Sequence, residues 1–64
     1  MARNYETDFL RYLYDKIADF DPVFITERRA NRYSRAYYRY HNIKIAVTTD
    51  NLDGTVTSIS ITKT

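Results

Sequence analysis

The sequence has no cysteine and no tryptophan, and it contains only one glycine, one proline and one histidine. Without cysteine the chain has neither a disulfide framework nor a thiolate metal site, which fits a reducing compartment. A phosphate-cradling loop needs several glycines, so the single Gly54 excludes one. With one imidazole and no thiol, the usual nucleophile and base pairs of hydrolases cannot be assembled. We therefore expect no enzymatic activity, no catalytic residue, no cofactor and no metal site.

Long apolar runs are missing as well. No stretch approaches the roughly 18 apolar residues of a membrane span, and the first residues contain no apolar signal segment. We expect a cytoplasmic protein with no membrane partner. Because 44% of the residues are hydrophobic and 16% aromatic, residues 1–64 should fold as a single small domain. A core of this size rarely contributes more than about 3–5 kcal/mol, so a homodimer or a complex with a partner is a further expectation.

The charge is distributed unevenly along the chain, although the net charge is only +2. Residues 1–25 carry three basic and five acidic side chains, residues 26–44 carry six and one, and residues 45–64 carry one and two. The three segments therefore have net charges of −2, +5 and −1. Such asymmetry indicates either a polyanionic partner or pairing between the segments.

The pattern of residues 5–20 predicts an amphipathic helix. Apolar side chains recur there at the spacing of three and four residues that lines one face of a helix. The helix should end before Pro22, because proline disfavours helical geometry in the residue before it. Acidic side chains gather on the opposite side and form a candidate acidic interface. They are Asp8, Asp15 and Asp19.

Residues 26–41 contain neither glycine nor proline and predict a second helix, with Thr26 as its N-cap. At 100° per residue this segment separates into an alanine and tyrosine face and an arginine face. A short extended piece at 23–25 precedes it and is a candidate for an additional strand. The candidate binding residues on and beside the arginine face are Arg28, Arg29, Arg32, Arg35, Tyr38, Arg39 and Lys44.

The last third of the chain changes to a period of two, which predicts an antiparallel hairpin. A type I turn with Gly54 as its left-handed bulge residue gives the two strands one shared apolar face. In this register Val56 falls on the other face, which is small and polar. The predicted cross-strand pairs are Ile45 with Ile61 and Val47 with Ile59. The expected fold class is α+β, with two helices packed on a C-terminal antiparallel β-hairpin in the order α-α-β-β.

The arginine face is the feature that bears most directly on function. Arginine binds phosphate with two parallel bonds and keeps its charge, so the face predicts a small non-enzymatic regulator that binds nucleic acid. The alternative is a protein-binding inhibitor of a host enzyme, which presents the Arg/Tyr helix or the acidic first helix as its interface. A solvated face, with arginines paired to the acidic helix, is the third interpretation. In size and composition the chain resembles the small accessory proteins of phages and mobile elements. The expected partner is nucleic acid or an acidic protein surface.

Overall fold

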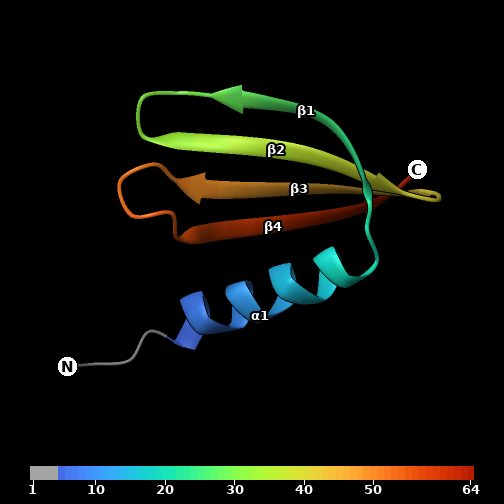
Figure 1. The fold of residues 1–64 in the computed structure, drawn as a ribbon, viewed down its shortest axis with the longest axis horizontal. Coiled ribbons are helices and arrows are strands. Elements are labelled where there is room, and N and C mark those ends of the chain that lie inside the picture. The colour runs from blue at the N-terminus through green and yellow to red at the C-terminus, as the bar shows by residue number, and fades with distance from the viewer. Residues whose placement is uncertain (1–4) are drawn as a thin grey trace.

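The computed structural model describes residues 5–64, which form one helix followed by four strands (Figure 1). The strands form one antiparallel sheet in the order β1-β2-β3-β4, so each strand pairs with its neighbour in the chain. The protein is therefore a small α+β domain with the element order α-β-β-β-β. The elements are α1 (Tyr5–Asp19), β1 (Val23–Arg29), β2 (Tyr33–Tyr40), β3 (Ile43–Asp50) and β4 (Val56–Lys63).

The predicted arrangement of two helices on a C-terminal hairpin is wrong in its second helix. Residues 26–41 form the end of β1, a loop, the whole of β2 and the first residue of a turn, and the extended piece at 23–25 is the beginning of β1. Tyrosine favours strands, and the segment alternates at a period of two as well as at 3.6. A two-stranded hairpin alone is marginal in water. Pairing β2 with β3 extends the sheet and brings two tyrosines to the core, which outweighs the helical propensity of arginine and alanine.

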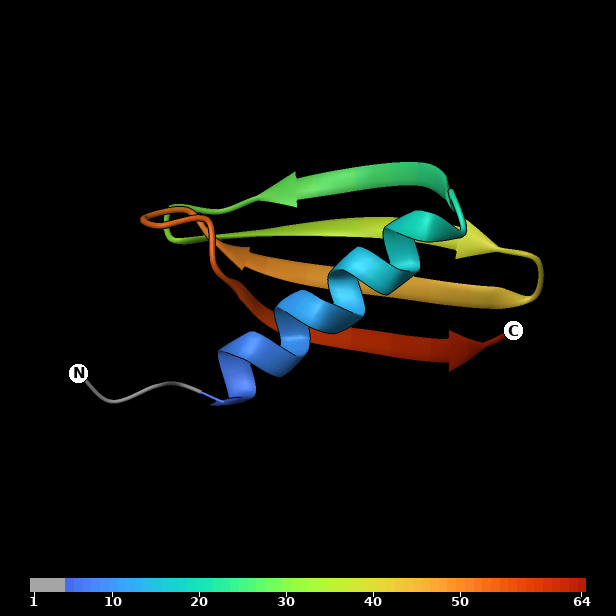
Figure 2. The same cartoon turned by 60° about the horizontal axis from the view of Figure 1, so that its bottom comes forward.

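α1 lies diagonally across one face of the sheet (Figure 2). We call the face under α1 the helix face and the opposite one the open face. The buried core on the helix face consists of Ile45, Val47 and Val56, each 5% exposed or less. Against it pack the partly buried side chains of Leu10, Tyr14, Ile17, Tyr38, Tyr40 and Ile59. The only helix of the described residues, α1, is neither long nor apolar enough to cross a membrane.

The β3–β4 hairpin follows the predicted register in its centre and departs from it near the turn. Gly54 has a φ of 74°, which suits a left-handed turn residue. A bulge at Thr57 then shifts the register by one residue, so that Thr49 pairs with Val56. The prediction that Val56 lies on the polar face is wrong, because this shift turns its side chain to the helix face. The confirmed cross-strand pairs are Ile45 with Ile61 and Val47 with Ile59.

Asn51 joins the two turns at one end of the sheet. Its backbone N–H donates to the Arg32 carbonyl at 2.7 Å, and its side-chain Nδ2 donates to the Ala30 carbonyl at 3.0 Å. The Ser34 hydroxyl donates to Asn51 Oδ1 at 2.6 Å. These bonds hold the β1–β2 loop against the β3–β4 turn, and they fix the backbone at the start of β2.

Candidate nucleic-acid interface

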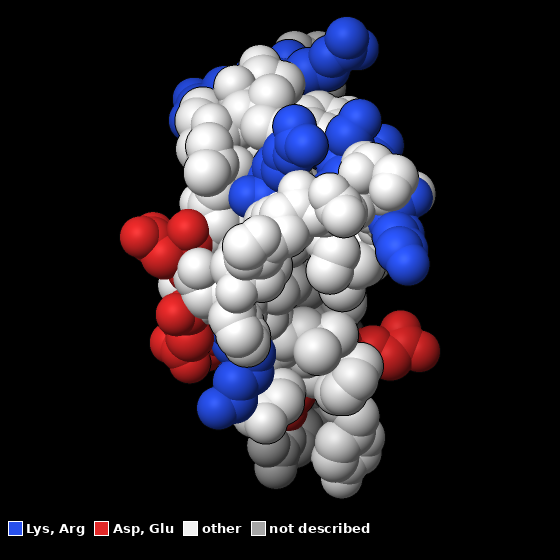
Figure 3. Space-filling view, turned by 90° about the vertical axis from the view of Figure 1, so that its right-hand side faces the viewer, with Lys and Arg blue, Asp and Glu red and all other residues white. Residues whose placement is uncertain are grey.

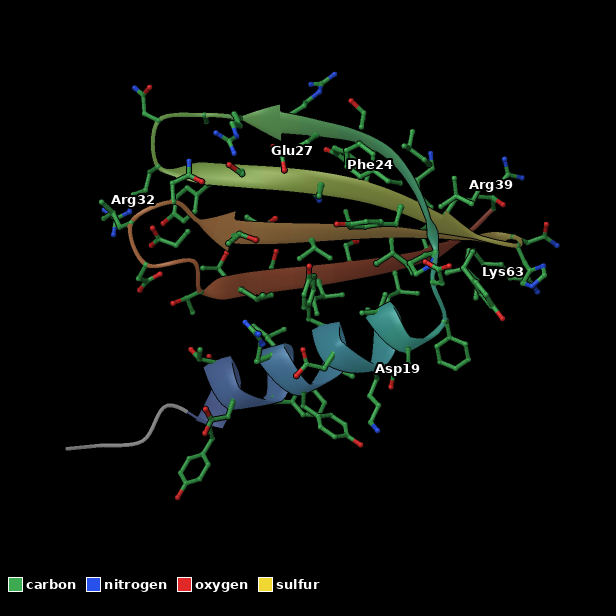
Figure 4. All side chains as sticks on the ribbon, in the orientation of Figure 1. Asp19, Phe24, Glu27, Arg32, Arg39 and Lys63 are labelled. Atoms are coloured by element: carbon green, nitrogen blue, oxygen red, sulfur yellow. The ribbon has the colours of Figure 1, made fainter. Side chains whose placement is uncertain are left out.

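The strands divide the predicted binding residues between the two faces of the sheet. Side chains alternate along a strand, so consecutive residues of β1 and β2 point to opposite faces. Arg29 and Tyr38 lie on the helix face, and Arg32 lies in the β1–β2 loop. The loop and the far end of β2 are at opposite ends of the sheet (Figure 4). The residues brought together on the open face are Arg28, Arg35, Arg39 and Lys44.

Two pairs of cations stand directly opposite each other on the open face. Arg28 of β1 pairs with Arg35 of β2, and Arg39 of β2 pairs with Lys44 of β3. Like charges in directly opposed positions destabilise a sheet. None of the four takes part in an ion pair within the described part of the chain. The Nε–H of Arg39 donates a hydrogen bond to the carbonyl of His41 at 3.0 Å. The open face therefore carries positive charge that no carboxylate of the described residues neutralises in an ion pair.

Tyrosines alternate with arginines on this face along β2. The order is Tyr33, Arg35, Tyr37 and Arg39, because odd-numbered residues of β2 point to the open face. Tyr33 is 44% exposed, and Tyr37 is half-buried. The Arg32 guanidinium lies 5.8 Å from the ring centroid of Tyr33, and that of Arg35 lies 5.6 Å from the ring centroid of Tyr37. Both distances are within the range of cation–π attraction.

Two shallow hollows run along the open face and share Arg28 and Tyr37. They have volumes of about 370 Å³ and about 500 Å³. The first is also lined by Ile25, Thr26 and Lys44. The second continues toward the β1–β2 loop past Tyr33, Ser34, Arg35 and Thr48. Together they make a basic and aromatic groove that follows β2.

Carboxylates are almost absent from the open face. Asp50, at its end, is the one carboxylate that the register places there among the described residues, and its Oδ2 lies 3.8 Å from Arg32 Nε. Glu27 lies on the helix face and pairs with Arg29 at 3.1 Å. In Figure 3 most of the basic atoms gather in the upper part of the molecule, on the side of β1 and β2, and most acidic atoms lie below them, next to one further basic group. The separation of charge inferred along the chain is therefore also a separation in space.

The candidate acidic interface forms an exposed stripe on α1. Asp15 pairs with Arg11 of the same helix at 3.4 Å. Asp19 lies on α1, away from both Arg32 and Arg39 (Figure 4). Among residues 5–64 no ion pair joins Asp15 or Asp19 to an arginine of the sheet. Within this molecule the arginines of the sheet therefore do not fold onto these two carboxylates.

Tyr38 belongs to the helix face, where it packs against the core rather than beside the arginines. Its ring meets that of Phe24 edge-on at 5.7 Å. Burial, followed by the neighbouring Tyr14 and by Glu27, raises the pKa of Tyr38 above its ordinary value. The helical period missed Tyr33 and Tyr37, because it set them opposite the arginines. The period of two is the signal that places them on the same face.

The histidine and the carboxylates of the described residues form no evident metal site. His41 has a φ of 53° in the two-residue turn between β2 and β3, where its ring stacks edge-on against Tyr40 at 4.4 Å. No group of three or more His, Asp or Glu side chains that could hold a metal ion occurs among residues 5–64.

Comparison of the chain with protein-family models, curated proteins and solved structures finds no match. The chemistry of the open face can nevertheless be stated from its groups. Guanidinium groups bind phosphate with two parallel hydrogen bonds, and a lysine ammonium binds it as a point charge. Tyrosine rings offer flat surfaces on which bases stack, and their hydroxyls bind phosphate oxygens. The open face thus combines both kinds of group on a hydrogen-bonded sheet.

Proposed function

We propose that this protein binds nucleic acid through the open face and catalyses no reaction on it. The observation that carries the proposal is the pair of opposed cations at Arg28 and Arg35, repeated at Arg39 and Lys44. A sheet whose charges served its own stability would place opposite charges in such positions. A row of phosphates supplies the missing negative charge, and both cations of each pair then contribute to binding.

The spacing of the two pairs favours an extended ligand over a small anion. Arg35 and Arg39 are four residues apart on β2, which corresponds to about 13 Å at 3.3 Å per residue. A single phosphate would have to draw both pairs together over Tyr37, whereas a polyanion contacts each pair in succession. Tyr37 lies midway between Arg35 and Arg39 on the same face. An uncharged part of the ligand, between two phosphates, would contact its ring.

Salt dependence tests the proposal directly. Four neutralised phosphates predict that log K falls with log salt with a slope of about −3.6 for a duplex and about −2.8 for a single strand. Arg28→Gln combined with Arg35→Gln removes two of the four contacts, so the slope should fall to about half. Arg11→Gln combined with Lys16→Gln removes the same charge from α1 and is the matched control. An affinity that does not change with salt concentration, or that falls equally in both double variants, contradicts the proposal.

A protein partner is the second candidate, and a groove on the helix face favours it. The groove has a volume of about 220 Å³ and lies between the end of α1 and the sheet. Phe20 and Ile61 on its walls are more than half exposed. Its lining residues are Ile17, Phe20, Pro22, Tyr40, Ile43, Ile45 and Ile61. A stoichiometric protein complex that survives nuclease treatment, and that Ile61→Asp abolishes, would favour this candidate over nucleic acid.

A further inference from the structure

We infer that the ligand of the open face is a single strand of nucleic acid, with bases stacked on Tyr33 and Tyr37 and phosphates held by the flanking cations. This inference rests on the proposed function and specifies its ligand. Two features carry it: the width of the sheet, and the order of side chains along β2.

The open face is too wide for a groove of duplex DNA. Three strand spacings of about 4.8 Å separate β1 from β4, which gives a sheet about 14 Å across before side chains are added. The major groove is about 12 Å wide and admits a helix or a two-stranded ribbon. Against a duplex the open face therefore meets only the phosphate ridges, which leaves the rings of Tyr33 and Tyr37 without bases to contact.

The order of groups on β2 matches an extended single strand. Tyr33, Arg35, Tyr37 and Arg39 follow one another on one face at intervals of about 6.6 Å, two residues of strand each. A single strand likewise alternates a flat base with a charged phosphate along its length. Tyr37 lines both hollows of the groove, so a base stacked on its ring has cations on both sides.

The backbone of Tyr33 is held in place before any ligand binds. The Ala30 N–H donates to the Tyr33 carbonyl at 2.8 Å, and the bonds of Asn51 fasten the preceding loop. The Arg32 guanidinium lies over the ring of Tyr33, 5.8 Å from its centroid. A platform that is already ordered loses little conformational entropy when a base stacks on it. Stacking accepts any base, because every base has a π face, so we expect weak sequence preference.

Fluorescence anisotropy with a labelled single-stranded oligonucleotide of about twelve nucleotides tests the inference, a length within the range of about 4–16 nucleotides that a single OB-fold domain covers. The matched duplex and inorganic polyphosphate serve as competitors. We expect the single strand to bind more tightly than the duplex, and polyphosphate to compete poorly because it has no bases. Tyr33→Leu should weaken single-strand binding by about 5- to 150-fold, and Tyr37→Leu likewise.

The controls separate stacking from loss of fold. Tyr33→Phe and Tyr37→Phe keep the ring and lose only the hydroxyl, so both should bind far more tightly than the leucine variants. Tyr12→Leu changes a tyrosine on α1 that is 57% exposed and should have no effect. Equal affinity for all three polyanions, with no effect of the leucine variants, overturns the single-strand inference and leaves electrostatic binding by the open face intact. Absence of salt-dependent binding to any of the three overturns the proposed function as well.

Discussion

Replacing Arg28 by threonine should stabilise the free protein while weakening its binding to nucleic acid. Arg28 stands directly opposite Arg35 and forms no ion pair within the described residues. Threonine is a good strand former and carries no charge, so the substitution removes the repulsion without disturbing the strand. The two effects have opposite signs because the charge of Arg28 repels Arg35 in the free protein and attracts phosphate in the complex.

The size of the stabilisation follows from the geometry of the pair. Directly opposed like charges cost about 0.2–1 kcal/mol. In a domain of this size 1 kcal/mol corresponds to about 4–8 °C in Tm, so Arg28→Thr should raise the Tm by roughly 1–8 °C. The gain should shrink near 1 M salt, where the Debye length is about 3 Å.

Thermal unfolding followed by circular dichroism, at low salt and near 1 M salt, measures the effect. A double-mutant cycle with Arg35→Thr isolates the coupling between the two arginines. Arg29→Thr is the matched control, because it makes the same change one residue further along β1, on the helix face. It removes the exposed ion pair with Glu27 and should cost about 0–1 kcal/mol. The reasoning would be refuted if Arg28→Thr were less stable than the parent protein at low salt, or if Arg29→Thr raised the Tm as much as Arg28→Thr does.

Three further predictions concern the fold. The raised pKa of Tyr38 means that the folded chain holds this proton more tightly than the unfolded chain, so the associated stability is present below about pH 10 and is lost at higher pH. Urea unfolding at about pH 9 and pH 11 should show a smaller alkaline loss in Tyr38→Phe, and an unchanged loss would contradict the assignment. Asn51→Ala removes two side-chain hydrogen bonds and should lower the free energy of unfolding by about 1–3 kcal/mol, with faster amide exchange in the β1–β2 loop; unchanged exchange would argue against its role. Val47→Ala removes two methyl groups from the core under α1 and should cost about 1.5–3 kcal/mol in urea unfolding, and a cost near zero would mean that α1 does not close this core.

The elements that could be predicted from the sequence are those with clear local signals. α1 ends at Asp19, before Pro22, as the apolar spacing and the proline indicate. The β3–β4 hairpin follows from strict alternation and from Gly54 in its turn. β2 could not be assigned in this way, because its tyrosines, alanine and arginines fit a helix and a strand equally well. The loop at 30–32 has no glycine or proline to mark it.

The candidate site was predictable in its residue types and not in its geometry. Four of the seven proposed binding residues lie together on the open face. Arg29 and Tyr38 lie on the other face, because a period of two separates neighbours that a helix leaves on adjacent flanks. The same change of period brings Tyr33 and Tyr37 beside the cations. Choosing between the periods depends on pairing with β3, which is a tertiary interaction that no local pattern contains.

The position of α1 at the start of the element order has a consequence during synthesis. The strands that α1 covers are made after it, and Val56 follows Ile17 by 39 residues. At about 5–20 residues per second, roughly 2–8 s pass between the two. An isolated helix of this length is marginally stable in water, so the apolar side chains of the nascent α1 segment stay exposed to solvent during this interval. The core closes only after β4 has left the ribosome, which makes the last strand the one that completes the domain.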